Sequence, residues 1–502
     1  MLNQYYKLNE FYSLFYDEKR VLLHAPQNQF QEDGIAETSF ESKIHPAYAI
    51  ILSFFTGAKN LKATLKDIST HMDINETEIL QAIKPLLENN ERVWIEYDNS
   101  LFAFPKNTLL KNPNKSKRDI IDLKKYNFND IDIFSKRNFI GPTEIQMLIN
   151  TNCVTDCIYC YVDNRKKNNG IFPISRLKEL IYEAKSLGVS NFDISGTELF
   201  LYKYWYEFLE TLSSVGYKPY LSTKIPLREE DIIKLKHLGF ERFQFSIDSI
   251  DSSKIIKINR ILNSNYIHKI RESISKFTKH GFKLRVNIVL TKYNDSIEEI
   301  VNVLNFLKGF PSVYEISLNP AGRSIYKGES EFNNFKISLE SYNKLENYFN
   351  NQKNIEDYHF NIIVSGLNTR ERYVQDIELK KSEFEGRIYC SANLSKIHIL
   401  PDGNVSICDQ LYWNENFIIG NVLEESIKSV WNSRKAKDLN DLKRIDFSNQ
   451  SPCKTCSEFE KCRNGLGVCY SEVLQAYGEN NWDFPDPACP NAPKPIYSLY
   501  HE

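Results

Sequence analysis

The chain has 502 residues, with 63 Lys and Arg against 65 Asp and Glu, and a net charge of −2. This length predicts about three domains, and a hydrophobic content of 42% is enough to build their cores. The balanced charge gives no overall attraction to nucleic acid or to a membrane surface. The chain shows neither a signal peptide nor a run of about 18 apolar residues, so we expect a cytoplasmic protein with no membrane-spanning helix.

The first region, residues 1–108, shows three helical patterns followed by two strand-like runs. The helical patterns cover residues 45–55, 61–71 and 76–89, and the strand-like runs cover residues 92–98 and 100–105. Three helices and a β-hairpin are typical of a winged helix, which binds DNA or packs against another domain. The region has no concentrated Lys and Arg face, which disfavours DNA. The polar residues 109–140 that follow are predicted to be a linker.

Residues 141–370 alternate strand-like runs with amphipathic helices. Six runs are strand candidates: 144–150, 191–195, 218–223, 242–248, 283–290 and 313–319. Buried apolar strands that alternate with helices predict a parallel sheet, and six such units predict a partial βα barrel. In such folds the functional side chains gather at the C-terminal ends of the strands.

A cysteine triplet follows the first of these strands directly. Cys153, Cys157 and Cys160 have the spacing C-x3-C-x2-C. Three thiolates on short tethers suit a soft-metal site, and in a cubane iron–sulfur cluster they leave one iron without a protein ligand. A structural zinc ion is the alternative, and it would recruit a distant fourth ligand.

Seven further cysteines crowd into the C-terminal region, residues 386–502, which has little regular periodicity. Its fold is therefore expected to depend on metal. Thiolates bind both iron and zinc, so structural zinc is again the alternative at the C-x2-C-x5-C element. The seven are Cys390, Cys408, Cys453, Cys456, Cys462, Cys469 and Cys489.

The triplet resembles that of the radical S-adenosylmethionine (SAM) superfamily, which has the same spacing and an aromatic residue before the last cysteine, here Tyr159. The resemblance implies a cluster whose open iron binds the methionine amino and carboxylate groups of SAM. The cofactor then yields a 5′-deoxyadenosyl radical that takes a hydrogen atom from the substrate, while the protein supplies binding and orientation.

Other landmarks of the family recur in order along the barrel region. The run Ser-Gly-Thr-Glu at 195–198 resembles a Gly-Gly-Glu-Pro motif, and Ser-Ile-Asp at 246–248 matches the family's motif near the ribose and carboxylate. The resemblance implies cofactor contacts at ten positions: Tyr159, Gly196, Thr197, Glu198, Ser222, Ser246, Asp248, Arg260, Asn287 and Leu318.

The cysteine-rich region resembles the SPASM extension of radical SAM enzymes, which holds two auxiliary 4Fe–4S clusters. The chain departs from the pattern between Cys462 and Cys469, which are separated by six residues where the family usually has three. The resemblance assigns one set of four cysteines to a distal cluster and one set of three to a proximal cluster, with one iron left open or bound by another residue type. The distal set is Cys453, Cys456, Cys462 and Cys489, and the proximal set is Cys390, Cys408 and Cys469.

The whole architecture resembles maturases of ribosomally synthesised peptides. It implies an α/β fold with a partial (β/α)6 radical SAM barrel, an N-terminal winged-helix-like domain and a C-terminal SPASM domain. It also implies SAM, three 4Fe–4S clusters, a flavodoxin- or ferredoxin-type electron donor, and a precursor peptide. The leader of that peptide would add a strand to the N-terminal domain. The expected product is a thioether, carbon–carbon or ether cross-link.

Two rival functions remain open. One is a sulfatase-type maturase that oxidises Ser or Cys to formylglycine, for which the N-terminal module is not needed. Its resemblance implies that Asp409, next to Cys408, acts as a base that accepts a substrate proton. The other is a non-catalytic iron–sulfur scaffold that binds peptides. The sequence indicates no nucleic-acid or membrane partner and no oligomeric state.

Overall fold

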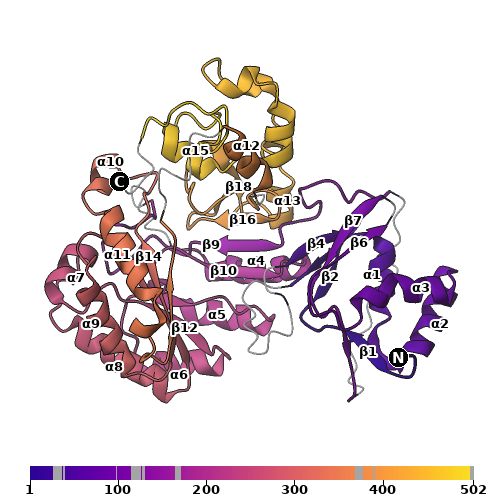
Figure 1. Ribbon diagram of the computed structural model, residues 1–502, viewed down its shortest axis with the longest axis horizontal. Helices are drawn as coiled ribbons and strands as arrows, with labels where there is room; N and C mark the ends of the chain where they lie inside the picture. Colours follow the sequence, from indigo (N-terminus) through magenta and orange to yellow (C-terminus); the bar gives the residue numbers. More distant parts are fainter. Residues whose placement is uncertain are drawn as a thin grey trace. The chain divides into compact units, whose positions relative to one another are not determined.

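The computed structural model describes residues 1–25, 37, 40–97, 99–114, 126, 130–163, 171–367, 377–387 and 390–497. It forms two compact units, which we call the first and second units (Figure 1). The first consists of residues 1–144 with 184–191, and the second of residues 145–183 with 192–502. Within the described residues, no helix has the length and apolar character needed to cross a membrane.

The first unit contains three small sheets and three helices. The sheets have the strand orders β5-β1-β8, β2-β3-β4 and β6-β7. The strands are β1 (Tyr5–Leu8), β2 (Ser13–Asp17), β3 (Arg20–His24), β4 (Glu41–Ile44), β5 (Thr56–Asn60), β6 (Val93–Tyr97), β7 (Ser100–Phe104) and β8 (Leu109–Lys111), and the helices are α1 (Pro46–Ser53), α2 (Leu61–Met72) and α3 (Glu76–Ile83).

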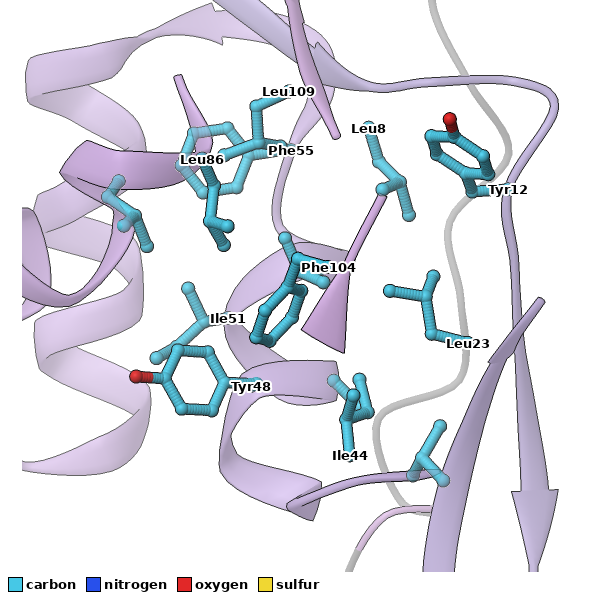
Figure 2. Close-up of a cluster of buried hydrophobic side chains, with 14 of the residues drawn as sticks. Leu8, Tyr12, Leu23, Ile44, Tyr48, Ile51, Phe55, Leu86, Phe104 and Leu109 are labelled. Carbon is cyan, nitrogen blue, oxygen red and sulfur yellow. The ribbon is translucent and has the colours of Figure 1, made fainter. Parts of the chain in front are cut away.

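The three helices and the β6–β7 hairpin lie where the sequence indicates, and a winged-helix relationship stays a prediction. The strands β1 to β5 were not expected, because runs of four or five residues are too short to show clear alternation. One apolar core joins helices and strands, with Leu8, Leu23, Ile44, Phe55 and Phe104 among its fully buried members (Figure 2).

The predicted linker, residues 109–140, is partly structured. Strand β8 begins at Leu109 and pairs with β1. Farther on, Asp17 and Arg20 form a buried ion pair at 2.9 Å. Arg20 donates to two backbone carbonyls of the segment 135–140, and Asp17 Oδ1 accepts two of its backbone N–H groups at 2.8 and 2.9 Å. Most of residues 115–129 lie outside the described part of the chain.

Residues 184–191 pack with the first unit. Gly188 has a φ of 76°, and a Cβ at that position would lie 1.8 Å from the ring of Phe15. The backbone N–H of Ser190 donates to the carbonyl of Thr143 at 2.8 Å. This turn therefore needs glycine both for its backbone conformation and for the close approach of an aromatic ring.

The second unit has all six predicted strands, alternating with helices, so the prediction of a mixed α/β fold is confirmed. In chain order the elements are β9 (Glu144–Met147), α4 (Ile174–Ser186), β10 (Asn191–Ile194), α5 (Trp205–Ser214), β11 (Ser222–Thr223), α6 (Glu229–His237), β12 (Arg242–Ser246), α7 (Ser252–Asn259), α8 (Tyr266–Lys279), β13 (Lys283–Leu290), α9 (Ile297–Lys308), β14 (Val313–Pro320), α10 (Glu329–Asn333), α11 (Leu339–Phe349) and β15 (Asn361–Val364).

Strands β11 to β15 form one parallel sheet in chain order. Alternate residues of β13 are buried, which places one face of that strand in the core. Strands β9 and β10 instead share a sheet with C-terminal strands, in the order β10-β9-β16-β17-β18. The C-terminal elements are α12 (Ile377–Gly386), β16 (Lys396–Ile399), β17 (Asn404–Ser406), β18 (Ile418–Asn421), α13 (Ile427–Trp431), α14 (Arg434–Asp438), a π-helix (Glu460–Leu466) and α15 (Tyr470–Tyr477).

Candidate functional site

The cysteine triplet lies on a loop after β9, and the end of α7 holds this loop in place. The backbone N–H of Asp156 donates to the carbonyl of Asn259 at 3.1 Å, and that of Ile158 donates to the carbonyl of Ile258 at 2.9 Å. Cys157 is buried while Cys153 is exposed. The backbone of the loop is therefore fixed around Cys157, and Cys153 stays accessible.

A buried polar network lies under this loop. Lys224 Nζ is 2.9 Å from Asp248 Oδ2 and 2.8 Å from the hydroxyl of Tyr159. Tyr159 and Asn259 also donate to Asp248 Oδ2, the latter at 2.5 Å. Asp248 Oδ1 accepts the backbone N–H of Val289 at 2.9 Å. Both carboxylate oxygens of Asp248 are thus occupied within the protein.

The network is charged at neutral pH. Burial opposes ionisation of Asp248, but Lys224 and the hydrogen bonds from Tyr159 and Asn259 hold the pKa of this carboxyl below its usual value. Burial likewise opposes the charge on Lys224, and Asp248 raises the pKa of the amine above its usual value. Burial, followed by the charge of Asp248, raises the pKa of Tyr159 well above that of a free phenol.

A contact of Asp248 with the cofactor stays a prediction. In this structure the side chain of Asp248 is completely buried and fully hydrogen-bonded. It joins the end of β12 to Tyr159 of the triplet loop. Asn259 carries the network further, because its Nδ2 lies 3.4 Å from the sulfur of Cys157. Hydrogen bonds to cysteine sulfur influence the potential of an iron–sulfur cluster.

The residues after β10 form a tight turn that packs against the end of β9. Gly196 has a φ of 92°, and a Cβ there would lie 2.2 Å from Leu148 Cδ1. The hydroxyl of Thr197 donates to the carbonyl of Asn150. Only glycine suits this backbone conformation and packing together, and a contact of Gly196 with the cofactor stays a prediction.

Glu198 is a buried carboxylate beside β11. Its Oε2 accepts the hydroxyl of Thr223 at 2.7 Å and the backbone N–H of Lys224 at 3.3 Å. Burial raises the pKa of Glu198, and these two hydrogen bonds oppose that rise. The Gly-Thr-Glu run and the end of β11 therefore meet next to the buried network.

Two other predicted contact residues share one face of the parallel sheet. Ser246 is in register with Asn287, and Asn287 with Ser317. Leu318 was expected to line the same space, but it is in register with Ile288 and is completely buried with it. Successive residues of a strand point to opposite faces, so Leu318 belongs to the core.

Arg260 and Ser222 are exposed at the ends of α7 and β11. Arg260 has a φ of 60° and borders a cavity of about 720 Å³, together with Val154 of the triplet loop and Tyr266 of α8. A cationic side chain therefore lines a cavity that the triplet loop also borders.

Four C-terminal cysteines line a single cavity of about 280 Å³. Helix α12 contributes Phe384 and neighbouring side chains to the same cavity, although it lies before the predicted start of the domain at residue 386. These four thiols are a complete ligand set for a cubane cluster. They are the predicted distal set: Cys453, Cys456, Cys462 and Cys489.

The other three C-terminal cysteines influence one another electrostatically. Burial raises the pKa of the Cys408 thiol, and the neighbouring Asp409, Cys390 and Cys469 contribute to its environment. Burial also raises the pKa of Cys469 to about 12, with contributions from Glu472 and Cys390. The three thiols of the predicted proximal set are therefore brought together despite the longer loop before Cys469.

Asp409 lies beside a thiol of the predicted proximal set. Its Oδ1 is 3.5 Å from the sulfur of Cys408. Burial, and then the charge of Asp409, raises the pKa of Tyr161, which directly follows Cys160. A carboxylate therefore lies beside Cys408, and its charge also influences a tyrosine that follows the triplet.

Sequence reasoning missed Lys224, Asn259 and Arg463. Lys224 follows the predicted strand end at Ser222 and Thr223, and a lysine there beside an aspartate at the next strand end is a usable signal. Asn259 contacts Cys157, which lies 102 residues away in the chain, and Arg463 contacts Cys453, which lies 10 residues away. No spacing in the sequence marks either contact.

Comparison with known proteins agrees with these motifs. Residues 147–307 match the model of the radical SAM superfamily, and residues 390–457 match SPASM, an iron–sulfur cluster-binding domain. A probable GTP 3′,8-cyclase of Sulfurisphaera tokodaii is 23% identical over 53% of this chain and 80% of its own length. A GTP 3′,8-cyclase of Clostridium botulinum is 27% identical over 36% of this chain, which spans 59% of that relative.

Among solved structures, Streptococcus suis SuiB bound to its precursor peptide SuiA has a similar fold. The TM-score is 0.60 at 15% identity, over 96% of this chain and 99% of SuiB. SuiB has also been solved with S-adenosylmethionine bound. The chain thus carries a radical SAM domain over residues 147–307 and a SPASM iron–sulfur cluster-binding domain over residues 390–457.

Proposed function

We propose that this chain modifies a ribosomally synthesised precursor peptide by removing a hydrogen atom and forming a side-chain cross-link. The observation that carries the proposal is the extent of the likeness to SuiB, which covers 96% of the chain at a TM-score of 0.60. That extent includes the first unit, which the radical SAM and SPASM models leave unmatched. SuiB is itself bound to a precursor peptide in the solved structure.

We assign the first cluster to the triplet. When bound, this cluster and SAM supply the electron and the radical that begin the reaction. Tyr159, Gly196, Thr197, Glu198 and Ser222 would position the cofactor from the triplet loop, β10 and β11, and Ser246, Arg260 and Asn287 from the later elements. Glu198 suits an ammonium group because it is a buried carboxylate, and Arg260 suits a carboxylate because it is a cation at a cavity mouth.

We assign two auxiliary clusters to the C-terminal cysteines, which makes three clusters in all. The four cysteines of the 280 Å³ cavity would hold the distal one. Cys390, Cys408 and Cys469 would hold the proximal one and leave an iron open to a substrate thiolate. Asp409, which is 3.5 Å from Cys408 and close to Tyr161, would accept the proton that the substrate loses as its radical is oxidised.

The first unit would bind the leader of the precursor as an added strand. The β6–β7 hairpin offers two strand edges, and its face away from the core exposes Trp94 and Leu101. These side chains lie on one face, because Trp94 pairs with Ala103 and Glu96 with Leu101. Backbone hydrogen bonds give affinity in strand addition, and such side chains give specificity. A tethered peptide would then reach the active site at a high local concentration.

The names of the curated relatives favour one rival, a GTP 3′,8-cyclase activity. Those relatives match 36–53% of this chain at 23–27% identity, so they share part of its length. A sulfatase-type maturase and a non-catalytic scaffold are the other rivals. The two enzymatic rivals predict that different substrates stimulate cleavage of SAM, and the scaffold predicts no cleavage.

The test is anaerobic reconstitution of the full chain, followed by iron and sulfide analysis and an assay of 5′-deoxyadenosine with SAM and a reductant. Short reading frames beside the gene supply candidate peptides, and GTP and a Ser- or Cys-containing sulfatase peptide are tested in parallel. We expect about four irons per cluster and a peptide product that has lost two hydrogen atoms. Conversion of GTP or formation of formylglycine would replace the proposal, and full clusters without SAM cleavage would leave a scaffold.

A further inference from the structure

Arg463 is a buried cation with no carboxylate partner in the described part of the chain. It follows Cys462 on the π-helix and is 7% exposed. Its Nη2 lies 3.2 Å from the sulfur of Cys453 and 2.9 Å from the carbonyl oxygen of Asp483. Its guanidinium carbon lies 4.9 Å from the centre of the Phe447 ring.

The other nitrogen atoms of Arg463 make no further hydrogen bond of normal geometry within the described part of the chain. Nε and Nη1 are buried without a hydrogen-bond acceptor among the described residues. The phenol of Tyr470 is the other neighbour, and although burial raises its pKa, the charge of Arg463 opposes that rise. Burying an unpaired charge costs several kcal/mol, so an anionic group is expected beside this guanidinium.

The four cysteines of the distal set supply that group, because Arg463 lines the same 280 Å³ cavity. A cubane held by four thiolates is anionic in both oxidation states, and it gains a further negative charge on reduction. A fixed cation next to it stabilises the reduced form more than the oxidised form. Charge and hydrogen bonds to the sulfurs are recognised ways to tune such a potential.

We propose that Arg463 raises the reduction potential of the distal cluster and so makes that cluster an electron acceptor. The donor is the substrate radical, which loses one electron to the clusters and one proton to a carboxylate as the cross-link is completed. The electron then leaves through an external flavodoxin- or ferredoxin-type carrier. This inference rests on the proposed assignment of the distal cluster, and Arg463 is a positioning residue that does not touch the substrate.

The experiment is a redox titration of the reconstituted full chain, followed by electron paramagnetic resonance. The signal that disappears in Cys456→Ala identifies the distal cluster. In Arg463→Met we expect the ratio of reduced to oxidised distal cluster at a fixed potential to fall at least tenfold, which is about 59 mV for one electron. Arg463→Lys keeps the positive charge, so the reduction potential of the distal cluster should shift less in this variant.

Arg444→Met is the matched control. Arg444 stacks on Phe459 at 4.8 Å and donates to the carbonyl of Lys454 at 3.0 Å, in the same domain. Its removal should leave the potential unchanged. A full iron content with an unchanged potential in Arg463→Met would overturn the inference.

If the distal cluster does not form in a variant, its iron content replaces the potential as the measured quantity. Loss of the distal iron in Arg463→Met, with retention in Arg463→Lys, supports the role of the charge. Loss in both variants would show that only the shape of the arginine matters and would also overturn the inference. Absence of any distal cluster in the unaltered chain would instead refute the proposed function.

Discussion

The two cysteine sites of the second unit balance their buried charges in different ways. Under the triplet loop, Lys224 and Asp248 form an ion pair at 2.9 Å with both carboxylate oxygens occupied. In the distal cavity, Arg463 meets a thiol, backbone carbonyls and an aromatic ring, with no carboxylate among the described residues. The first site therefore pairs its buried charges within the protein, whereas the buried cation of the second site would be balanced by the anionic cluster that we propose there.

The largest expected effect comes from replacing the triplet, Cys153→Ala, Cys157→Ala and Cys160→Ala together. Cleavage of SAM should be lost completely, because no thiolate remains to hold the first cluster. The iron content should fall by only about four atoms per chain, since the auxiliary sites are separate. A loss of nearly all iron would show that the triplet site and the auxiliary sites assemble together. That result would contradict the view that they are separate.

Removal of iron should then separate the two sites. After chelation under anaerobic conditions, we expect rapid proteolysis within residues 440–490, because the buried Arg463 and the thiols lose their common partner. The triplet loop should stay protected by its ion pair. Hydrogen exchange followed by mass spectrometry measures residues 440–490 and the triplet loop in one sample. Equal exchange rates in these two regions would contradict the expected difference between the sites.

The ion pair itself is tested by Asp248→Ala. This change leaves Lys224 buried without its counter-charge and should lower the free energy of unfolding by about 3–5 kcal/mol. The double variant Asp248→Ala with Lys224→Met should recover part of that loss, because no charge then remains unpaired. Chemical denaturation under anaerobic conditions gives both values, and identical stabilities of the single and double variants would argue against a buried pair.

A smaller effect concerns pH and Glu198. Burial raises the folded-state pKa of Glu198 above its unfolded value, so the folded chain binds more protons between the two values. Stability should fall as pH rises through this window, with a slope of at most about 1.4 kcal/mol per pH unit. Glu198→Gln should remove that part of the slope. A pH profile of the unfolding free energy that is unchanged by this substitution would contradict the assignment.

Local sequence signals predicted much of the second unit. The run KLRVNIVL became β13 with the predicted bounds, because alternate residues of the run are buried in the sheet. The resemblance to the SPASM extension grouped four cysteines as a distal set, and these four line one cavity. Strands β1 to β5 were missed, because each has only four or five residues. The hydrogen bonds of Asp248 with Lys224 and Asn259 were missed, because only the tertiary fold brings these residues together.

The packing of Gly188 against Phe15 has a consequence for exchanging modules between related enzymes. The segment 184–191 belongs to the first unit, although it lies far along the chain within the barrel sequence. A fragment that starts after residue 144 would therefore keep this turn but lose the aromatic ring against which it packs. A hybrid that joins another N-terminal module to this second unit would need to transplant residues 184–191 as well, because the chain crosses the boundary between the units three times.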